Sequence, residues 1–290
     1  MPQFFTFVVV LLVAVFGPGM ATTVRASTTI DPIHRYAYGA NFGWLDLVAG
    51  TNNGAVIGEY SCSGYIFSAN VGWISLGSGS PANGIQYQNL SANDFGVNND
   101  GFGNLRGYAW GANIGWISFE NIGAPGVDLL TGKWTGSVWS ANCGWISFSN
   151  AVAFVQTDSI QKGTLAANGL PIAWLLANFG TTSVDPLADP DHDGMSNQDE
   201  YLAGTDPNDA ISNLRIINFN RGTPTATYTV ATWSSLPTRF YALQKAPALT
   251  NSLWSDFIST PLAGWNSAGF DDFNSTNEFF RVRAYRPLTP

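Results

Sequence analysis

The sequence predicts an all-β chain, in which two β domains are joined by a short helical segment. Glycine, asparagine, serine and aromatic residues are abundant, whereas only 11% of the residues are charged. That composition is typical of strands connected by many turns. An aromatic motif recurs in the first half of the chain, and repetition at this spacing indicates a tandem β architecture. Short apolar runs separated by turn residues recur after residue 213, and they indicate a second β domain.

Residues 1–26 are expected to be an export signal. An apolar run from Phe4 to Phe16 ends at a Gly-Pro-Gly turn, and small-residue cleavage sites follow after Ala21 and after Ala26. The run is shorter than a bilayer requires, and the sequence has no second long apolar stretch. We therefore expect a mature chain without a transmembrane span, secreted or held at the cell surface, with room for two or three domains.

Residues 27–155 are expected to form a domain of four β hairpins. The motif reads aromatic-x-aromatic, then Gly or Ser, then Ala-Asn-x-Gly-Trp, with Ser137 replacing the first aromatic in the last copy. Its tryptophans are spaced 29, 43 and 29 residues apart, so the unit is a duplicated pair of motifs. The four copies occupy residues 36–47, 65–76, 108–119 and 137–148, and their tryptophans are Trp44, Trp73, Trp116 and Trp145.

The Ala-Asn-x-Gly segment supplies the residues that tolerate a positive φ, so we place the hairpin turn there. A hairpin symmetric about the Asn sets Tyr38, Phe67, Trp110 and Trp139 opposite the four tryptophans. The other face of each second strand is then apolar, as in Ile74 and Leu76, and period-2 alternation predicts that it forms the core. Strands preceding the third and fourth copies, at 96–101 and 127–130, suggest that each copy is a three-stranded meander.

The four tryptophans admit two interpretations. A repeat cannot bury its own face alone, so packing of these aromatics between repeats is the favoured one. The alternative is an exposed row that stacks on sugar rings, as in many secreted modules. Exposure of the indoles discriminates the two, because buried rings would leave no surface for a ligand.

Residues 189–200 fit the calcium-loop pattern D-x-[DN]-x-[DN]-G-x5-E at every constrained position. Alternating acids bring hard oxygen ligands to one point, Gly194 permits the sharp turn, and the closing glutamate supplies two oxygens. The sequence therefore predicts a Ca²⁺ site. Its expected ligands are the side chains of Asp189, Asp191, Asp193 and Glu200, the backbone carbonyl of Met195, and Asn197 directly or through water.

The charge distribution agrees with an ion site in this segment. Eight acids and no Lys or Arg lie between Asp185 and Asp209, which equals the whole formal net charge of −8. Asp185 or Asp206 is expected to add a ligand or a second, weaker site. No basic patch indicates nucleic acid as a partner.

Two helices are expected around this loop, at 170–179 and 197–203, each ended by a glycine. The first helix does not run directly into the loop as in an EF-hand, which favours a rigid, calcium-clamped turn over a calcium sensor. The runs GLPIAW, NFG and EYLAGTDP with the Asp loop make residues 169–212 resemble the thrombospondin type 3-like, EF-hand-loop segment of secreted bacterial surface proteins. That resemblance implies a structural spacer.

Residues 156–168 are expected to be a linker, and residues 213–290 a small antiparallel β-sandwich. Its expected strands include residues 214–217, 225–232 and 279–285. This module also resembles the β module that follows the calcium segment in those surface proteins. Cys62 and Cys143 permit a disulfide in an oxidising compartment, although they occupy different positions of the repeat.

No catalytic constellation is evident, so we expect that the chain is not an enzyme. It has two histidines, no nucleophile elbow, and no acid that recurs at an equivalent repeat position. The expected function is that of a calcium-stabilised structural or adhesive cell-surface protein. A carbohydrate-binding module that uses the repeated tryptophans is the alternative. The expected partners besides calcium are an extracellular polysaccharide or a cell-surface protein.

Overall fold

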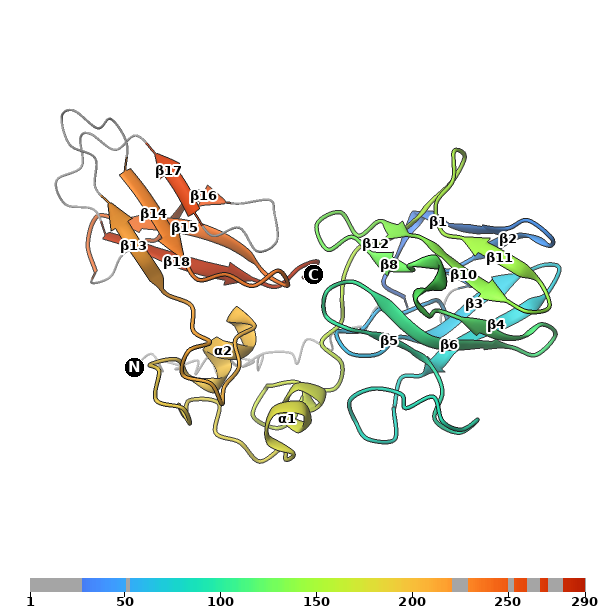
Figure 1. Ribbon diagram of the computed structural model, residues 1–290, viewed down its shortest axis with the longest axis horizontal. Helices are drawn as coiled ribbons and strands as arrows, with labels where there is room; N and C mark the ends of the chain where they lie inside the picture. Colours follow the sequence, from blue (N-terminus) through green and yellow to red (C-terminus); the bar gives the residue numbers. More distant parts are fainter. Residues whose placement is uncertain are drawn as a thin grey trace, which may run out of the picture.

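The computed structural model describes residues 28–50, 53–220, 229–249, 253–259, 267–270 and 279–289. The chain is all-β, as predicted, and contains two short α-helices. Figure 1 shows two β units with the helical segment between them. The expected signal peptide, residues 1–26, lies outside the described residues. Within the described ranges, no helix has the length and apolar character needed to cross a membrane.

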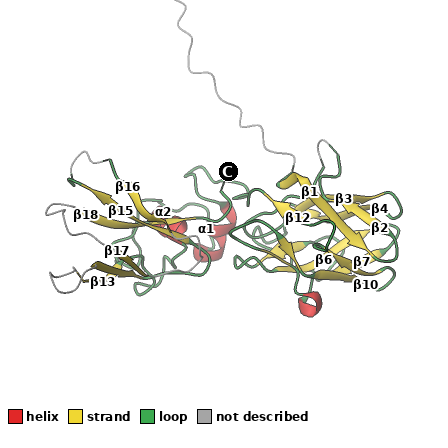
Figure 2. Cartoon of the chain, turned by 90° about the horizontal axis from the view of Figure 1, so that it is seen from above, coloured by secondary structure: helices red, strands yellow, loops and turns green. Residues whose placement is uncertain are grey.

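The four aromatic motifs form four β hairpins that close into one barrel. The hairpins pair side by side, and β11 pairs back onto β1 through Tyr38↔Ser147 and Gly39↔Ile146, so eight antiparallel strands form a closed ring (Figures 1 and 2). The strands are β1 (Ile30–Gly39), β2 (Gly43–Asp46), β3 (Ser63–Ser68), β4 (Gly72–Ser78), β6 (Leu105–Gly111), β7 (Gly115–Ser118), β10 (Ser137–Ser140) and β11 (Gly144–Ser147).

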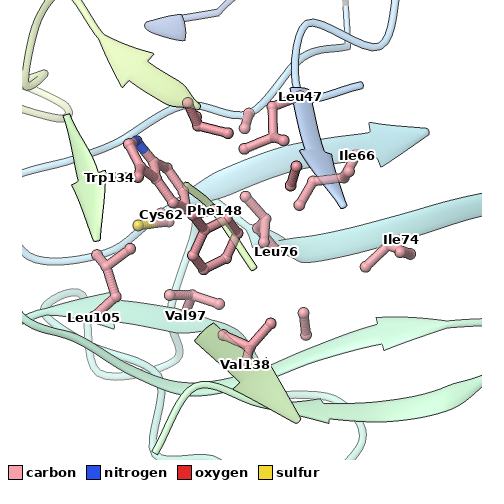
Figure 3. Packing of buried hydrophobic residues seen from close by; sticks show 14 of the residues in the cluster. Leu47, Cys62, Ile66, Ile74, Leu76, Val97, Leu105, Trp134, Val138 and Phe148 are labelled. Atoms are coloured by element: carbon pink, nitrogen blue, oxygen red, sulfur yellow. The ribbon is translucent and has the colours of Figure 1, made fainter. Parts of the chain in front are cut away.

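The barrel interior is filled by the aliphatic face of each hairpin. Ile74, Ile117 and Ile146 are each at most 2% exposed, and Phe119 and Phe148 pack beside them with ring centroids 5.9 Å apart. Figure 3 shows side chains from several strands meeting in this core. Only about 10 Å³ of space remains between the inward side chains. An eight-stranded barrel is just wide enough for its own side chains, so this interior holds no ligand.

The aromatic pairs lie on the outside of the barrel. Each tryptophan of the second strand stands opposite the aromatic expected there, for example Tyr38↔Trp44 and Trp110↔Trp116. The favoured interpretation, burial between repeats, is wrong, because Trp44, Trp73, Trp116 and Trp145 are 46%, 47%, 43% and 44% exposed. The physical reason is closure: the hairpins pair edge to edge through their backbones, and the alternate aliphatic residues already fill the interior.

Short strands extend the ends of the barrel strands. β5 (Val97–Asn99) pairs with the first half of β6, and β8 (Gly126–Val127) pairs with β9 (Trp134–Thr135) just before β10. These pairings follow the expected meander in the third and fourth copies. In the first copy the partner of β1 is instead β12 (Val155–Thr157), which follows the last hairpin. A 3-10 turn, η1 (Asn121–Gly123), packs over β10.

The hairpin tips are joined in a closed ring of side-chain hydrogen bonds. The Nδ2 of Asn70 donates to Phe42 O at 2.7 Å, and Asn113 and Asn142 repeat this contact on the preceding tips. Asn41 closes the ring onto Cys143 O at 3.0 Å. The motif glycine is needed beside each Asn, since Gly144 has a φ of +79° and a Cβ there would lie 3.0 Å from Asn41 Nδ2.

The helical segment follows the barrel. α1 (Ile172–Phe179) begins two residues later than expected, after Pro171, and ends at Gly180 in the left-handed region. α2 (Asn197–Ala203) has the expected bounds and ends at Gly204 in the same conformation. The two helices pack together through Trp174 and Tyr201, whose ring centroids are 5.6 Å apart.

The C-terminal module consists of two three-stranded antiparallel sheets that share one core. Trp233 and Tyr241, one from each sheet, are both buried in that core. Much of the expected strand at 225–232 lies outside the described residues, although its end belongs to β14. The first sheet contains β13 (Ile216–Asn220), β14 (Thr229–Trp233) and β17 (Ser267–Phe270), and the second contains β16 (Ser255–Ser259), β15 (Phe240–Ala246) and β18 (Phe279–Tyr285).

The two cysteines are not bridged. Cys62 is fully buried in the barrel core, whereas Cys143 lies at a hairpin tip, and both are free thiols. Burial raises the pKa of Cys62 to about 12. The thiol in the core is therefore neutral and acts as a small apolar side chain.

One carboxylate joins all three parts of the molecule. Glu59, from the barrel, accepts a hydrogen bond from the Tyr201 hydroxyl of α2 at 2.9 Å. Its other oxygen accepts from Nε of Arg286, which follows β18, at 2.9 Å. Arg239 of the C-terminal module donates to the Tyr201 and Leu202 carbonyls. The helical segment is therefore held against both β units at a single junction.

Candidate metal centre and aromatic surface

The three aspartates of the loop converge on one point. One carboxylate oxygen from each of Asp189, Asp191 and Asp193 lies within 4.8 Å of the others, and this is the one such group of His, Cys, Asp or Glu within the described residues. The turn that brings them together is built by backbone in the left-handed region, at His192 (φ 64°) and Gly194 (φ 95°). The sequence supplies this turn through the glycine, as expected.

Each aspartate divides its two oxygens between two tasks. Asp189 Oδ2 accepts from Gly194 N at 3.0 Å, Asp191 Oδ1 from Asp193 N at 3.3 Å, and Asp193 Oδ1 from Met195 N at 2.7 Å. These bonds hold the loop. The second oxygen of each aspartate is buried and has no hydrogen-bond partner. Buried acceptors without a partner are costly, and three of them converging on one point have the chemistry of cation ligands.

Two further predicted residues present orphaned oxygens in α2. Asn197 is fully buried; its Nδ2 donates to Asp185 O at 2.8 Å, while its Oδ1 has no partner. Glu200 is also fully buried, and neither of its carboxylate oxygens has a partner. Burial, with the negative charges of Asp191 and Asp193, raises the pKa of Glu200 to about 7. A carboxyl this deep is stable as an anion only beside a positive charge.

The donor set fits calcium. Together these five side chains present six buried oxygens without partners, and the carbonyl of Met195 is the expected seventh. Calcium takes six to eight oxygen ligands in flexible geometry, and a chain this rich in carboxylates suits a hard cation better than zinc. These residues would hold the ion and fix the start of α2. Asp185 and Asp206 lie outside the group, and their Oδ1 atoms accept backbone N–H bonds in local turns.

The aromatic surface consists of four exposed clusters on the outer face of the barrel. In each cluster the tryptophan packs against its cross-strand partner, edge-on in three clusters and tilted for Phe67–Trp73, with centroids between 4.6 Å for Trp110–Trp116 and 5.1 Å for Trp139–Trp145. In three clusters a tyrosine at the start of the motif adds a second edge contact, at 6.0 to 6.3 Å. Four indoles that are nearly half exposed on a folded surface are the feature that the carbohydrate-binding alternative requires.

One cluster differs from the others because it borders a pocket. The loop before β5 covers one side of Trp116, and Phe95 packs against this indole with centroids 5.1 Å apart. Asn89, Leu90, Phe95, Tyr108 and Trp116 line a hollow of about 400 Å³. The spacing of 43 residues between the second and third tryptophans, against 29 elsewhere, is the sequence signal of this loop.

Comparison with known proteins identifies no relative: no family model matches the chain, no curated protein matches it, and no solved structure matches it. The function must therefore be argued from the two sites themselves. The sequence predicted the Asp loop, whose three aspartates converge in the structure, but it did not predict Phe95 and Asn89, nor Glu59 and Arg286 at the junction. Those residues carry no local pattern, because they acquire their surroundings only when distant segments meet.

Proposed function

We propose that the chain is a secreted, calcium-stabilised structural or adhesive cell-surface protein without catalytic activity. The observation that carries this proposal is the set of six buried, unpartnered oxygens on the five side chains of the Asp loop and α2. A calcium ion there would neutralise the cluster and fix α2, whose Tyr201 contacts Glu59 of the barrel. The ion thus acts as a structural clamp between the β units. The thrombospondin type 3-like resemblance supports the same spacer role.

Calorimetric titration of the mature chain with calcium tests this function. We expect binding at micromolar to millimolar calcium, the range of extracellular and sensor sites, with magnesium much weaker because it demands octahedral geometry. Calcium should also protect residues 156–212 from protease, because removal of the ion by a chelator would leave the start of α2 unfixed. The clamp would be contradicted if calorimetry detects no binding at millimolar calcium and a chelator leaves the protease sensitivity of the chain unchanged. Surface labelling of intact cells tests the location.

Carbohydrate binding by the barrel is the second candidate, and exposure of the four indoles favours it. Sugar rings stack on exposed aromatic faces, and each indole offers one large apolar surface beside polar loop residues. The pocket beside Trp116 is the strongest single position, because it adds walls to the stacking face. The other three clusters then serve mainly as cross-strand supports of the barrel.

A glycan array tests this candidate and also supplies matched controls. Trp116→Ala and Trp44→Ala remove the same side chain at equivalent repeat positions, yet only Trp116 borders the pocket. We expect Trp116→Ala to abolish binding to the glycans that the wild type retains, and Trp44→Ala to leave it nearly intact. Equal losses in both variants would assign binding to the whole aromatic surface. Failure of the wild type to bind any glycan, with or without calcium, would exclude the candidate.

A further inference from the structure

A second, chemically different cleft lies between the helical segment and β18. It measures about 550 Å³, within the range of small-molecule sites. Its charged side chains are four basic residues and one acid, namely Lys162, Arg281, Arg283, Arg286 and Asp199. The chain as a whole carries 12 basic and 20 acidic residues. Basic side chains therefore outnumber acidic ones in this cleft, whereas acids predominate in the chain as a whole. Charge complementarity then indicates an anionic ligand.

Arg286 supplies independent evidence for a ligand. Its side chain is only 3% exposed, its Nε donates to Glu59 Oε1, and its guanidinium lies 5.3 Å from the centre of the Tyr201 ring. Its NH1 is buried and has no hydrogen-bond partner. A buried donor without an acceptor costs about 1–3 kcal/mol, more for a charged group. Arg286 lines this cleft and also the hollow beside Glu59 and Arg239, and an acceptor that reaches NH1 from a ligand in the cleft would satisfy it.

The other charged side chains of the cleft are held in place by neighbouring residues. Arg281 donates from Nε to Gln244 Oε1 at 2.8 Å and lies over Trp254, which leaves the rest of its guanidinium fork available. Arg283 lies over Tyr285, with its guanidinium carbon 4.8 Å from the ring centre. The acid, Asp199, accepts from the Ser196 hydroxyl at 2.7 Å at the start of α2, so its charge is directed to that helix.

We propose that this cleft binds the carboxylate of a uronate-type saccharide. Guanidinium forks recognise planar carboxylates through two parallel hydrogen bonds, and three arginines line this one cleft. An apolar wall from Leu202, which is 40% exposed, suits the ring that carries the carboxylate. α2 packs against β18, which closes this strand to an extended peptide added as a further strand. A compact ring ligand therefore fits better than an acidic peptide.

Titration calorimetry of the full mature chain in calcium buffer tests the proposal. The probes are trigalacturonate, its neutral methyl ester, and triglutamate. We expect trigalacturonate to bind roughly tenfold or more tightly than the other two, because charge-assisted bonds and ring contacts both contribute. Equal binding of the methyl ester would overturn the charge argument, and equal binding of triglutamate would overturn the saccharide. No binding at millimolar trigalacturonate would overturn both.

Two lysine variants locate the site. Lys162→Gln removes one charge at the cleft, and Lys133→Gln removes the same charge from the barrel, where Lys133 lies over Phe154. We expect roughly a fivefold loss of trigalacturonate affinity in the first variant and less than about a twofold loss in the second. Arg283→Gln should weaken binding at least as much as Lys162→Gln. Similar losses in Lys133→Gln and Lys162→Gln would show a diffuse charge effect and overturn the assignment. Because the cleft excludes the four repeat tryptophans, this result is independent of the glycan test of the barrel.

Discussion

At the scale of single residues, the Asp loop shows how a short pattern encodes a site. Asp189, Asp191 and Asp193 each use one oxygen to hold the loop backbone and leave the other buried without a partner. The loop is thus preorganised by the same side chains that would bind the ion. Preorganisation lowers the ordering cost of binding, although three carboxylates at close range repel one another until a cation arrives.

Asp191→Ala should abolish the stabilisation by calcium. At a calcium concentration one hundred times the dissociation constant, binding to the folded state alone stabilises by about 2.7 kcal/mol. We expect the free energy of unfolding of the wild type to rise by about that amount, and that of Asp191→Ala to be unchanged by calcium. Asp209→Ala is the control, because Asp209 belongs to the acidic segment but its Oδ1 accepts from Ile211 N in a local turn. Thermal unfolding with calcium and with a chelator measures both; a calcium response retained by Asp191→Ala would contradict the ligand set.

At the scale of elements, the hairpins separate the core from the surface by strict alternation. Ile117 points into the barrel and is 2% exposed, while its neighbour Trp116 points outward and is 43% exposed. The larger residue is therefore expected to contribute less to stability than the smaller one. Volume removed from a closed interior leaves a cavity, whereas a side chain removed from the surface is replaced by water.

Ile117→Ala should destabilise the protein by about 2–5 kcal/mol, the range for large-to-small substitution in a core. Trp145→Ala should cost about 0.5–1.5 kcal/mol, because this indole is 44% exposed and pairs with one aromatic ring, that of Trp139. Urea unfolding followed by circular dichroism gives both values. The reverse order would mean that the tryptophans contribute more to stability than the aliphatic interior of the barrel.

The ring of asparagines at the hairpin tips makes a second prediction at this scale. Asn142→Asp removes the Nδ2 donor to Ile114 O, and we expect a loss of about 1 kcal/mol in the free energy of unfolding. Asn150→Asp is the matched control, because Asn150 acts through its Oδ1, which accepts from Val152 N and Ala153 N and is retained by aspartate. Denaturant unfolding of the two variants side by side makes the comparison. Equal stability of both would show that the ring bonds contribute little.

The hairpins were predictable because their information is local. Turn residues, alternation and the aromatic pair all lie within twelve residues, so the register Tyr38↔Trp44 follows from the motif itself. Barrel closure was not predictable, since it depends on contacts such as Tyr38↔Ser147 between the first and last copies. The exposure of the tryptophans depends on closure, and for that reason the sequence, although it assigned the aliphatic face to the core correctly, favoured burial of the tryptophans between repeats.

At the scale of the whole molecule, the helical segment connects the proposed metal centre to the basic cleft. Tyr201 follows Glu200 directly and bonds to Glu59 of the barrel, while Arg286 bonds to the same carboxylate and lines the basic cleft. Gly194 and Met195 of the Asp loop line that cleft as well. Calcium binding at the proposed metal centre would change the charge beside the cleft, so we expect the two sites to be coupled.

Calcium should increase the affinity of the cleft for trigalacturonate. Without the ion, the aspartate cluster would place negative charge beside the cleft, because its neighbours Gly194 and Met195 line that cleft. A bound divalent cation offsets that charge, so we expect a coupling free energy of about 1–3 kcal/mol, equal in both directions. Calcium affinity should rise by the same factor when trigalacturonate is saturating.

Asp191→Ala separates this coupling from direct binding of calcium by the saccharide. The variant should bind trigalacturonate with an affinity that calcium does not change, because its loop no longer holds the ion, whereas the Asp209→Ala control should keep the wild-type response. Raising the ionic strength should reduce the coupling, since the interaction crosses solvent-accessible space. If Asp191→Ala responds to calcium as the wild type does, the effect belongs to the saccharide, and the two sites act independently.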